Sequence, residues 1–180
     1  GKMLSPGGKA FFIAISLIFG LSGSALAEGW FISVSGSGYS TPDSVGTGYE
    51  VSVGGGYMLN DYLSIEASVG FAQYVIEVEN EDDDQEELNV YEIPIALGVR
   101  ADLSPHAPID PFVEAGPMAY LTKVEGEDWT NSWGAYAGGG LAFHIGPGSI
   151  EIWIRYSISD FEDTSDYRLT YGLGGSFSGR

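Results

Sequence analysis

Apolar and polar residues alternate along most of this chain. From Tyr167 to Phe177 the sequence reads YRLTYGLGGSF, in which nearly every second residue is large and apolar and the residues between are small or polar. A period of two residues indicates a β-strand, because successive side chains of a strand point to opposite faces. The pattern occurs in eight segments, which predicts an all-β chain with strands at Trp30–Tyr39, Tyr49–Leu59, Tyr62–Phe71, Val90–Ala101, Phe112–Lys123, Trp133–Ile145, Ile150–Ser159 and Tyr167–Phe177.

Two of these segments contain proline. Pro94 lies inside the fourth and Pro117 inside the fifth. Proline cannot donate a hydrogen bond to a neighbouring strand, so we expect a bulge or a local break at Pro94. In the fifth segment the alternation is weakest, and we favour an outward row of Val113, Ala115, Ala119 and Leu121.

The connections between the segments also alternate. Four are long or polar, at residues 40–48, 77–89, 124–132 and 160–166. The three between them, at 60–61, 102–111 and 146–149, include two tight turns rich in Asn, Asp, Gly and Pro. Longer loops at one end and short turns at the other are typical of transmembrane β-barrels.

The first 27 residues are typical of a cleaved secretory signal peptide. Lys2 and Lys9 supply a basic start, residues 10–21 form an apolar run of 12 residues, and Ala25-Leu26-Ala27 is a small-x-small cleavage site. A membrane-spanning helix needs about 20 residues, so this run is too short to span. We therefore predict a signal peptide at 1–27 and one barrel domain at 28–180.

Two eight-stranded barrels are compatible with the alternation. A soluble, lipocalin-type barrel would place the large apolar row inside, whereas a membrane barrel would place it outside. The other row is mostly Ser, Gly and Ala with a few charges, which suits the narrow interior of an eight-stranded barrel. Aromatic residues gather near both ends of the predicted strands, as they do at the two membrane interfaces. The sequence thus favours an eight-stranded antiparallel up-and-down transmembrane β-barrel.

Several segments together resemble a known family. The signal-peptide pattern, the stretches GWFISVSGSGYS, PFVEAGPMAYL and WGAYAGGGLAFHIG, and the terminal aromatic strand are similar to the OmpA/OmpX-type outer-membrane β-barrel superfamily, over essentially all of residues 28–180. The resemblance implies the bacterial outer membrane, contact with its lipid and lipopolysaccharide, and recognition of the terminal strand by the barrel-assembly machinery. It also implies a role in envelope integrity, adhesion or surface interaction. We expect no periplasmic domain after the barrel.

Charged residues fall on the predicted inward row: Glu50, Glu66, Glu92, Arg100, Glu114, Glu151, Arg155 and Arg168. Buried charges need partners, so these side chains are expected to form ion pairs that fill the lumen. The expected pairs join Arg100 to Glu114, Arg168 to Glu50, and Arg155 to Glu66 or Glu92. The alternatives are a gated pore or a catalytic pair.

His144 and Glu151 raise the question of an enzyme. Outer-membrane lipid A deacylases, which are also eight-stranded, place a serine two residues after the histidine, where this chain has Gly146. We expect Ser149 to lie in a turn, which leaves His144 without a nucleophile in register. The sequence therefore predicts no enzyme and no cofactor.

The chain is strongly acidic, with a formal net charge of −18, and of 5 − 25 = −20 after removal of residues 1–27 with their two lysines. Such a charge excludes nucleic acid as a partner. Eight carboxylates lie between Glu77 and Glu87, but without the ligand spacing and the glycine of a calcium loop. We predict no specific metal site, only a loop that attracts divalent cations or basic partners through Glu81, Asp82, Asp83, Asp84, Glu86 and Glu87. The predicted function is a non-enzymatic surface role; the alternatives are a small-molecule channel or carrier, and an outer-membrane lipid-modifying enzyme.

Overall fold

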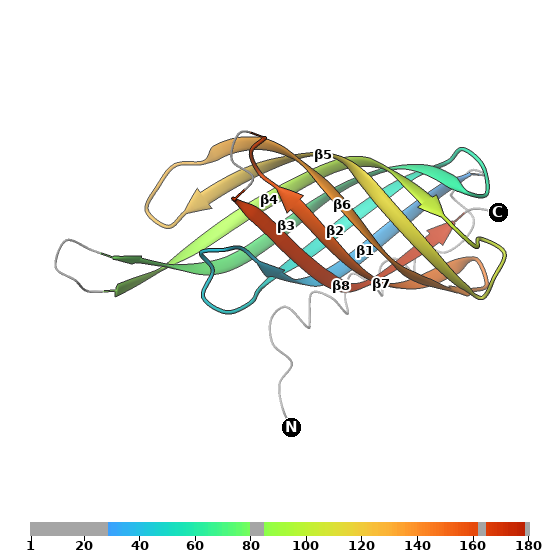
Figure 1. The fold of residues 1–180 in the computed structure, drawn as a ribbon, viewed down its shortest axis with the longest axis horizontal. Helices are drawn as coiled ribbons and strands as arrows, with labels where there is room; N and C mark the ends of the chain where they lie inside the picture. Colours follow the sequence, from blue (N-terminus) through green and yellow to red (C-terminus); the bar gives the residue numbers. More distant parts are fainter. Residues whose placement is uncertain (1–28, 80–84, 162–164, 179–180) are drawn as a thin grey trace, which may run out of the picture.

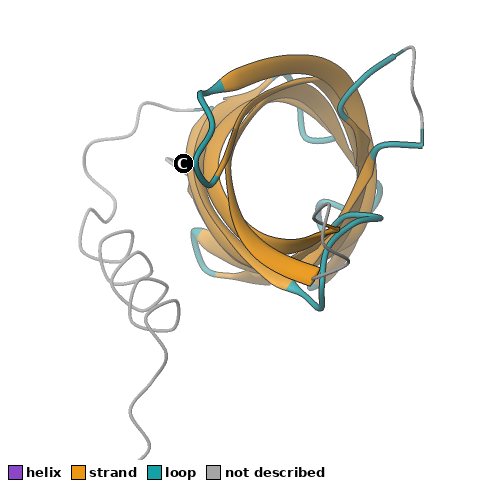
Figure 2. Cartoon of the chain, turned by 90° about the vertical axis from the view of Figure 1, so that its left-hand side faces the viewer, coloured by secondary structure: helices purple, strands orange, loops and turns teal. Residues whose placement is uncertain are grey.

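Eight antiparallel strands close into one barrel in the computed structural model, which describes residues 29–79, 85–161 and 165–178. Each strand pairs with its neighbours in sequence, and the last pairs with the first, so that the ring has no free edge (Figures 1 and 2). The strands are β1 (Trp30–Ser40), β2 (Gly48–Met58), β3 (Leu63–Glu79), β4 (Gln85–Asp102), β5 (Ile109–Val124), β6 (Thr130–Ile145), β7 (Gly148–Ile158) and β8 (Tyr167–Ser178). The predicted signal peptide lies outside the described residues and stays a prediction. In the described ranges no helix is long and apolar enough to cross a membrane.

The alternation places large apolar side chains outside, as expected for a barrel in lipid. Along β7, Ile152 and Ile154 are 45% and 54% exposed, whereas Glu151 and Ser157 of the other row are buried. Rings lie near both ends of the outer surface: Trp30 packs against Tyr57 at one end, and Tyr156 stacks on Tyr167 at the other. The predicted facing is confirmed along β7, while Val34 and Phe177, which were placed on the same apolar row, are buried. A narrow barrel has room inside only for the row of small and paired polar side chains.

The two prolines interrupt pairing without shifting the register. Between β3 and β4 the pairs stop at Val69 with Ile95 and resume at Ala72 with Glu92. Pro94 therefore causes the local break and no bulge. Along β5, Val113, Ala115 and Leu121 are exposed and Ala119 is half-buried, in agreement with the predicted facing.

The acidic segment after β3 differs from the expected loop. β3 continues to Glu79 and β4 begins at Gln85, so that the hairpin projects beyond the other strands (Figure 1). Within it Glu77 lies opposite Glu87 in the strand register. The charge of the segment indicated a loop, but pairing with β4 continues the β-ladder to Glu79 and Gln85. The loop between β1 and β2 supports its base, where the amide of Val45 donates to the carbonyl of Val75 at 2.7 Å.

We call the end with the β2–β3, β4–β5 and β6–β7 connections the turn end, and the opposite end the loop end. The turn between β2 and β3 is held by Asn60, whose Oδ1 accepts hydrogen bonds from the amides of Tyr62 and Leu63 at 2.8 and 3.0 Å. Gly146, between β6 and β7, has φ of +60°, a conformation that favours glycine. In outer-membrane barrels the short turns face the periplasm and the longer loops face outward.

Candidate functional site

The lumen holds the charged residues predicted to face inward. Glu50, Glu92, Arg100, Glu114, Glu151 and Arg168 are buried, and Glu66 and Arg155 are half-buried. They lie in layers along the barrel, each built around one arginine.

The loop-end layer is built around Arg168 of β8. Its guanidinium donates two hydrogen bonds to the carboxylate of Glu92, at 3.1 and 3.0 Å, in the planar geometry that strengthens such pairs. Glu92 has no solvent exposure. Its carboxylate also accepts from the hydroxyl of Tyr39 and, at 2.9 Å, from that of Thr122, while Arg168 also pairs with Asp166. Glu92 and Arg168 are thus joined across the lumen at the loop end by several bonds.

An apolar layer lies next to this cluster. Ala96, Met118, Tyr120 and Tyr136 form one buried group, and the hydroxyl of Tyr120 bonds to Ser157 Oγ at 2.6 Å. The aromatic bodies fill the lumen while the hydroxyl is satisfied, as buried tyrosines require.

Arg155 of β7 occupies the middle of the barrel. Its Nη2 lies 2.9 Å from Glu114 Oε1, and its Nε donates to the same oxygen at 3.0 Å. The guanidinium stacks over the ring of Tyr136, with 4.4 Å to the centroid. A small cavity of about 70 Å³ lies between this layer and the next.

The turn-end layer is built around Arg100 of β4. Its Nη1 lies 2.8 Å from Glu151 and 3.9 Å from Glu66, and its Nε donates to Asp102 at 2.8 Å. The Cζ atom of Arg100 lies 3.8 Å from the centroid of the Phe112 ring. One arginine is thus shared among three carboxylates.

The predicted pairings are wrong in each case. Arg100 does not pair with Glu114, although the two are opposite in register, and Arg155 takes Glu114 instead of Glu66 or Glu92. Arg168 pairs with Glu92 rather than Glu50. The reason is the reach of arginine across a narrow lumen. The pairs Arg100–Glu151, Arg155–Glu114 and Arg168–Glu92 each join strands that are not neighbours in the sheet. Asp102, Asp166 and Tyr39 were missed; Tyr39 had a signal, since it falls on the polar row of its strand.

A cavity of about 640 Å³ occupies the lumen at the turn end. It extends from the level of Arg100 and Glu151 to the turn residues Asn60, His106 and Gly146. The lumen therefore contains buried side chains toward the loop end and a cavity at the turn end.

Ser149 corrects a second prediction. It lies in β7 and not in a turn, and it is the register partner of His144 on β6. Its hydroxyl is bonded to Glu151 at 3.1 Å and to Ser176 at 2.7 Å, while Nε2 of His144 faces Asp110. A nucleophile does lie in register with the histidine, but its hydroxyl is engaged by other groups.

The predicted cation-attracting loop is only partly described. Glu81, Asp82, Asp83 and Asp84 lie outside the described residues, and Glu86 and Glu87 are exposed on the projecting hairpin. Within the described ranges no group of three or more His, Cys, Asp or Glu side chains has a metal-binding arrangement.

Comparison with known proteins identifies the family. The model of the outer membrane protein beta-barrel domain matches residues 14–177, and the chain therefore belongs to this family and to the bacterial outer membrane. No curated protein matches the chain by sequence.

Solved structures share the fold at low identity. OprG of Pseudomonas aeruginosa is 13% identical with a TM-score of 0.63, covering 87% of this chain and 100% of that chain. Neisserial surface protein A is 16% identical with a TM-score of 0.60, covering 84% and 97%. The outer membrane enzyme PagL is 16% identical with a TM-score of 0.52, covering 81% and 98%. Since these neighbours include an enzyme, the shared architecture does not choose the activity.

Proposed function

We propose that this outer-membrane barrel is a non-enzymatic, non-conducting surface protein whose acidic loop end binds divalent cations or basic segments of a partner. The observation that supports it is the separation of charge between lumen and surface. Outside residues 1–27 the chain has 7 − 2 = 5 Lys and Arg, and three of them, Arg100, Arg155 and Arg168, pair with carboxylates in the lumen. They are therefore not available to neutralise the outer surface.

The loop end carries carboxylates that face solvent. Exposed acids of the described loops and hairpin are Asp43, Glu77, Glu86, Glu87, Glu125, Glu127, Asp128 and Asp160. The described cation nearest to them in sequence is Lys123. Exposed charges act over about 8–10 Å at physiological salt, so such a rim attracts cations with modest affinity and strong salt dependence.

The bonds across the lumen at the loop end support the proposal that the barrel does not conduct. A current through the lumen would have to pass Glu92 and Arg168, both held by several bonds. We expect no stepwise conductance from the refolded protein in a planar lipid bilayer. Regular single-channel steps from both the wild-type protein and the Arg155→Met variant would contradict a closed lumen.

The binding proposal is tested by calorimetry with an oligolysine peptide and with calcium. Glu77→Gln, Glu86→Gln and Glu87→Gln combined should reduce the heat of binding and its dependence on salt. Asp61→Asn is the control, because Asp61 is also an exposed carboxylate, at 70%, but lies at the turn end. Equal heats of binding from the triple variant and the wild type would show that the hairpin carboxylates do not take part in binding.

A hydrolase is the second candidate, since Ser149 lies opposite His144. The geometry supports it less well, because the serine hydroxyl is bonded to Glu151 and Ser176 instead of the imidazole. Incubation of the refolded protein with phospholipid and lipopolysaccharide should release no more fatty acid than Ser149→Ala does. Release of fatty acid by the wild type but not by Ser149→Ala would show that the protein is a hydrolase and would contradict the non-enzymatic role.

A further inference from the structure

Asp110 and His144 form an unusual buried pair at the turn end. Asp110, the second residue of β5, lies opposite Ala142 of β6, so His144 is its diagonal neighbour on the same face of the sheet. The carboxylate is 1% exposed, and its Oδ1 accepts a hydrogen bond from the amide of Ser104 at 2.7 Å. The other oxygen, Oδ2, lies 3.6 Å from His144 Nε2, and neither of these buried atoms has a hydrogen-bond partner in the described structure.

A buried carboxylate oxygen without a donor is costly to leave unsatisfied. The separation of 3.6 Å is too long for a hydrogen bond between the two groups. It does fit two ligands of one metal ion. With metal–ligand distances of about 2.0–2.2 Å, it corresponds to an angle of about 110–130° at the ion, at or somewhat above the tetrahedral angle of zinc.

The cavity around the pair is electronegative. Its charged lining consists of the carboxylates Asp61, Glu66, Asp102, Asp110 and Glu151 and the guanidinium of Arg100, a formal charge of 1 − 5 = −4 with both histidines neutral. A focused negative field raises the local concentration of cations. A cavity of about 640 Å³ also has room for the water molecules that would complete a coordination shell.

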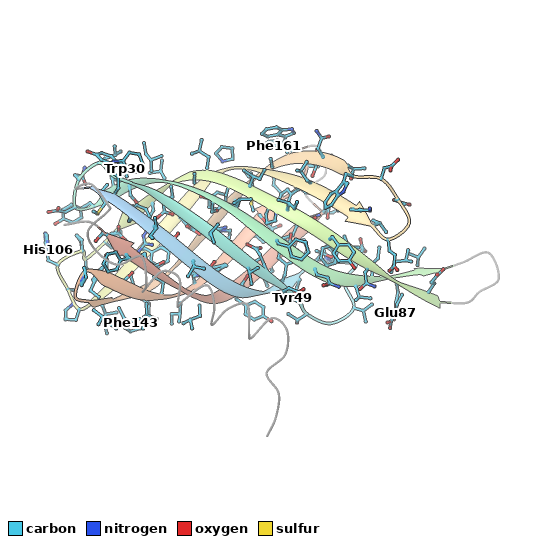
Figure 3. The ribbon with its side chains drawn as sticks, turned by 180° about the vertical axis from the view of Figure 1, so that it is seen from behind. Trp30, Tyr49, Glu87, His106, Phe143 and Phe161 are labelled. Atoms are coloured by element: carbon cyan, nitrogen blue, oxygen red, sulfur yellow. The ribbon has the colours of Figure 1, made fainter. Side chains whose placement is uncertain are left out.

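We propose that His144 Nε2 and Asp110 Oδ2 bind a divalent transition-metal ion of the zinc class at the turn end, with water as the remaining ligands. Imidazole and carboxylate together suit zinc, whereas calcium and magnesium prefer oxygen ligands alone. The ion joins the start of β5 to the end of β6 and partly neutralises the cavity. The site lies at the opposite end of the barrel from the acidic hairpin, as the positions of His106 and Glu87 in Figure 3 show for the two ends.

The chain supplies its own matched control. His106 Nε2 lies 3.5 Å from Asp61 Oδ2, which is nearly the same pair and separation at the same end, but these side chains are 71% and 70% exposed. If any neighbouring His and Asp sufficed, both pairs would bind the ion alike. The proposal requires the buried pair.

The test is titration of the refolded full chain in detergent with zinc by calorimetry, and with cobalt by visible absorption. We expect one tightly bound zinc ion, distinct from the weaker and salt-dependent binding by the acidic rim, and an intense absorption of four-coordinate cobalt. His144→Ala and Asp110→Asn should each weaken zinc binding at least tenfold and abolish the cobalt band, while His106→Ala leaves both unchanged. Heat-modifiable gel migration verifies that each variant is folded.

Three results would overturn the site. The first is a wild-type protein that binds zinc no better than folded His144→Ala. The second is an equal loss of binding in His106→Ala. The third is displacement of zinc by equimolar calcium, which would assign the heat to oxygen ligands such as those of the acidic hairpin.

Discussion

The buried carboxylates at the two ends of the lumen are paired with arginine in different ways. At the loop end Arg168 holds the fully buried carboxylate of Glu92 in a bidentate pair. The hydroxyls of Tyr39 and Thr122 donate to the same carboxylate. At the turn end Arg100 is shared by three carboxylates beside a cavity of about 640 Å³. The comparison shows that arginine holds one carboxylate by two bonds at the loop end, whereas at the turn end one arginine is spread over three carboxylates beside a cavity.

The largest loss of stability is expected at the loop end. Arg168→Met leaves Glu92 buried without its cation, which costs about 3–5 kcal/mol for a broken buried pair. Urea unfolding of the refolded protein in detergent measures the loss of stability. Replacing Glu92 and Arg168 together with apolar residues should recover most of it, and a loss for Arg168→Met within error of zero would mean that the pair does not stabilise the barrel.

A smaller effect is expected at the turn end. Arg100→Met removes the cation shared by Glu66, Asp102 and Glu151, but water in the adjacent cavity can solvate these carboxylates. We expect a loss of about 1–3 kcal/mol, the range for unsatisfied polar groups. The same urea titration provides the value, and a loss equal to that of Arg168→Met would show that the two ends do not differ in hydration.

The smallest effect is expected beyond the barrel wall, on the exposed loop after β5. Hydrogen bonds from the side-chain amide of Asn89, at 3.0 Å, and from its backbone amide lower the pKa of Glu125 below its ordinary value. Because the pKa of Glu125 is lower in the folded state, these hydrogen bonds stabilise the folded state fully above the pKa of the unfolded state. The stabilisation is lost as pH falls through the pKa of the folded state. NMR titration of the Glu125 carboxyl should show the low midpoint.

Asn89→Ala removes the side-chain donor and keeps the backbone one. It should therefore return the midpoint part of the way toward that of free glutamate. Asn131→Ala, on the neighbouring strand, is the control and should leave it in place. An unchanged midpoint in Asn89→Ala would exclude the side-chain bond.

The sequence by itself determined the barrel, because strand facing is a local property. The alternation in β7 places Ile152 and Ile154 on the face opposite Glu151, whatever the partner strand is. The narrow interior then leaves only one row that can be enclosed. The inward position of all three arginines follows from the same parity.

The pairing of those arginines was decided only by the tertiary structure. The β4–β5 register places Arg100 opposite Glu114, yet side chains that cross the lumen join Arg100 to Glu151 and Arg155 to Glu114. The extension of β3 into the acidic segment likewise depended on the presence of β4. His144 was visible in the sequence, but its juxtaposition with Asp110 arises from the stagger of β5 against β6, which closure of the ring sets and no short stretch of sequence encodes.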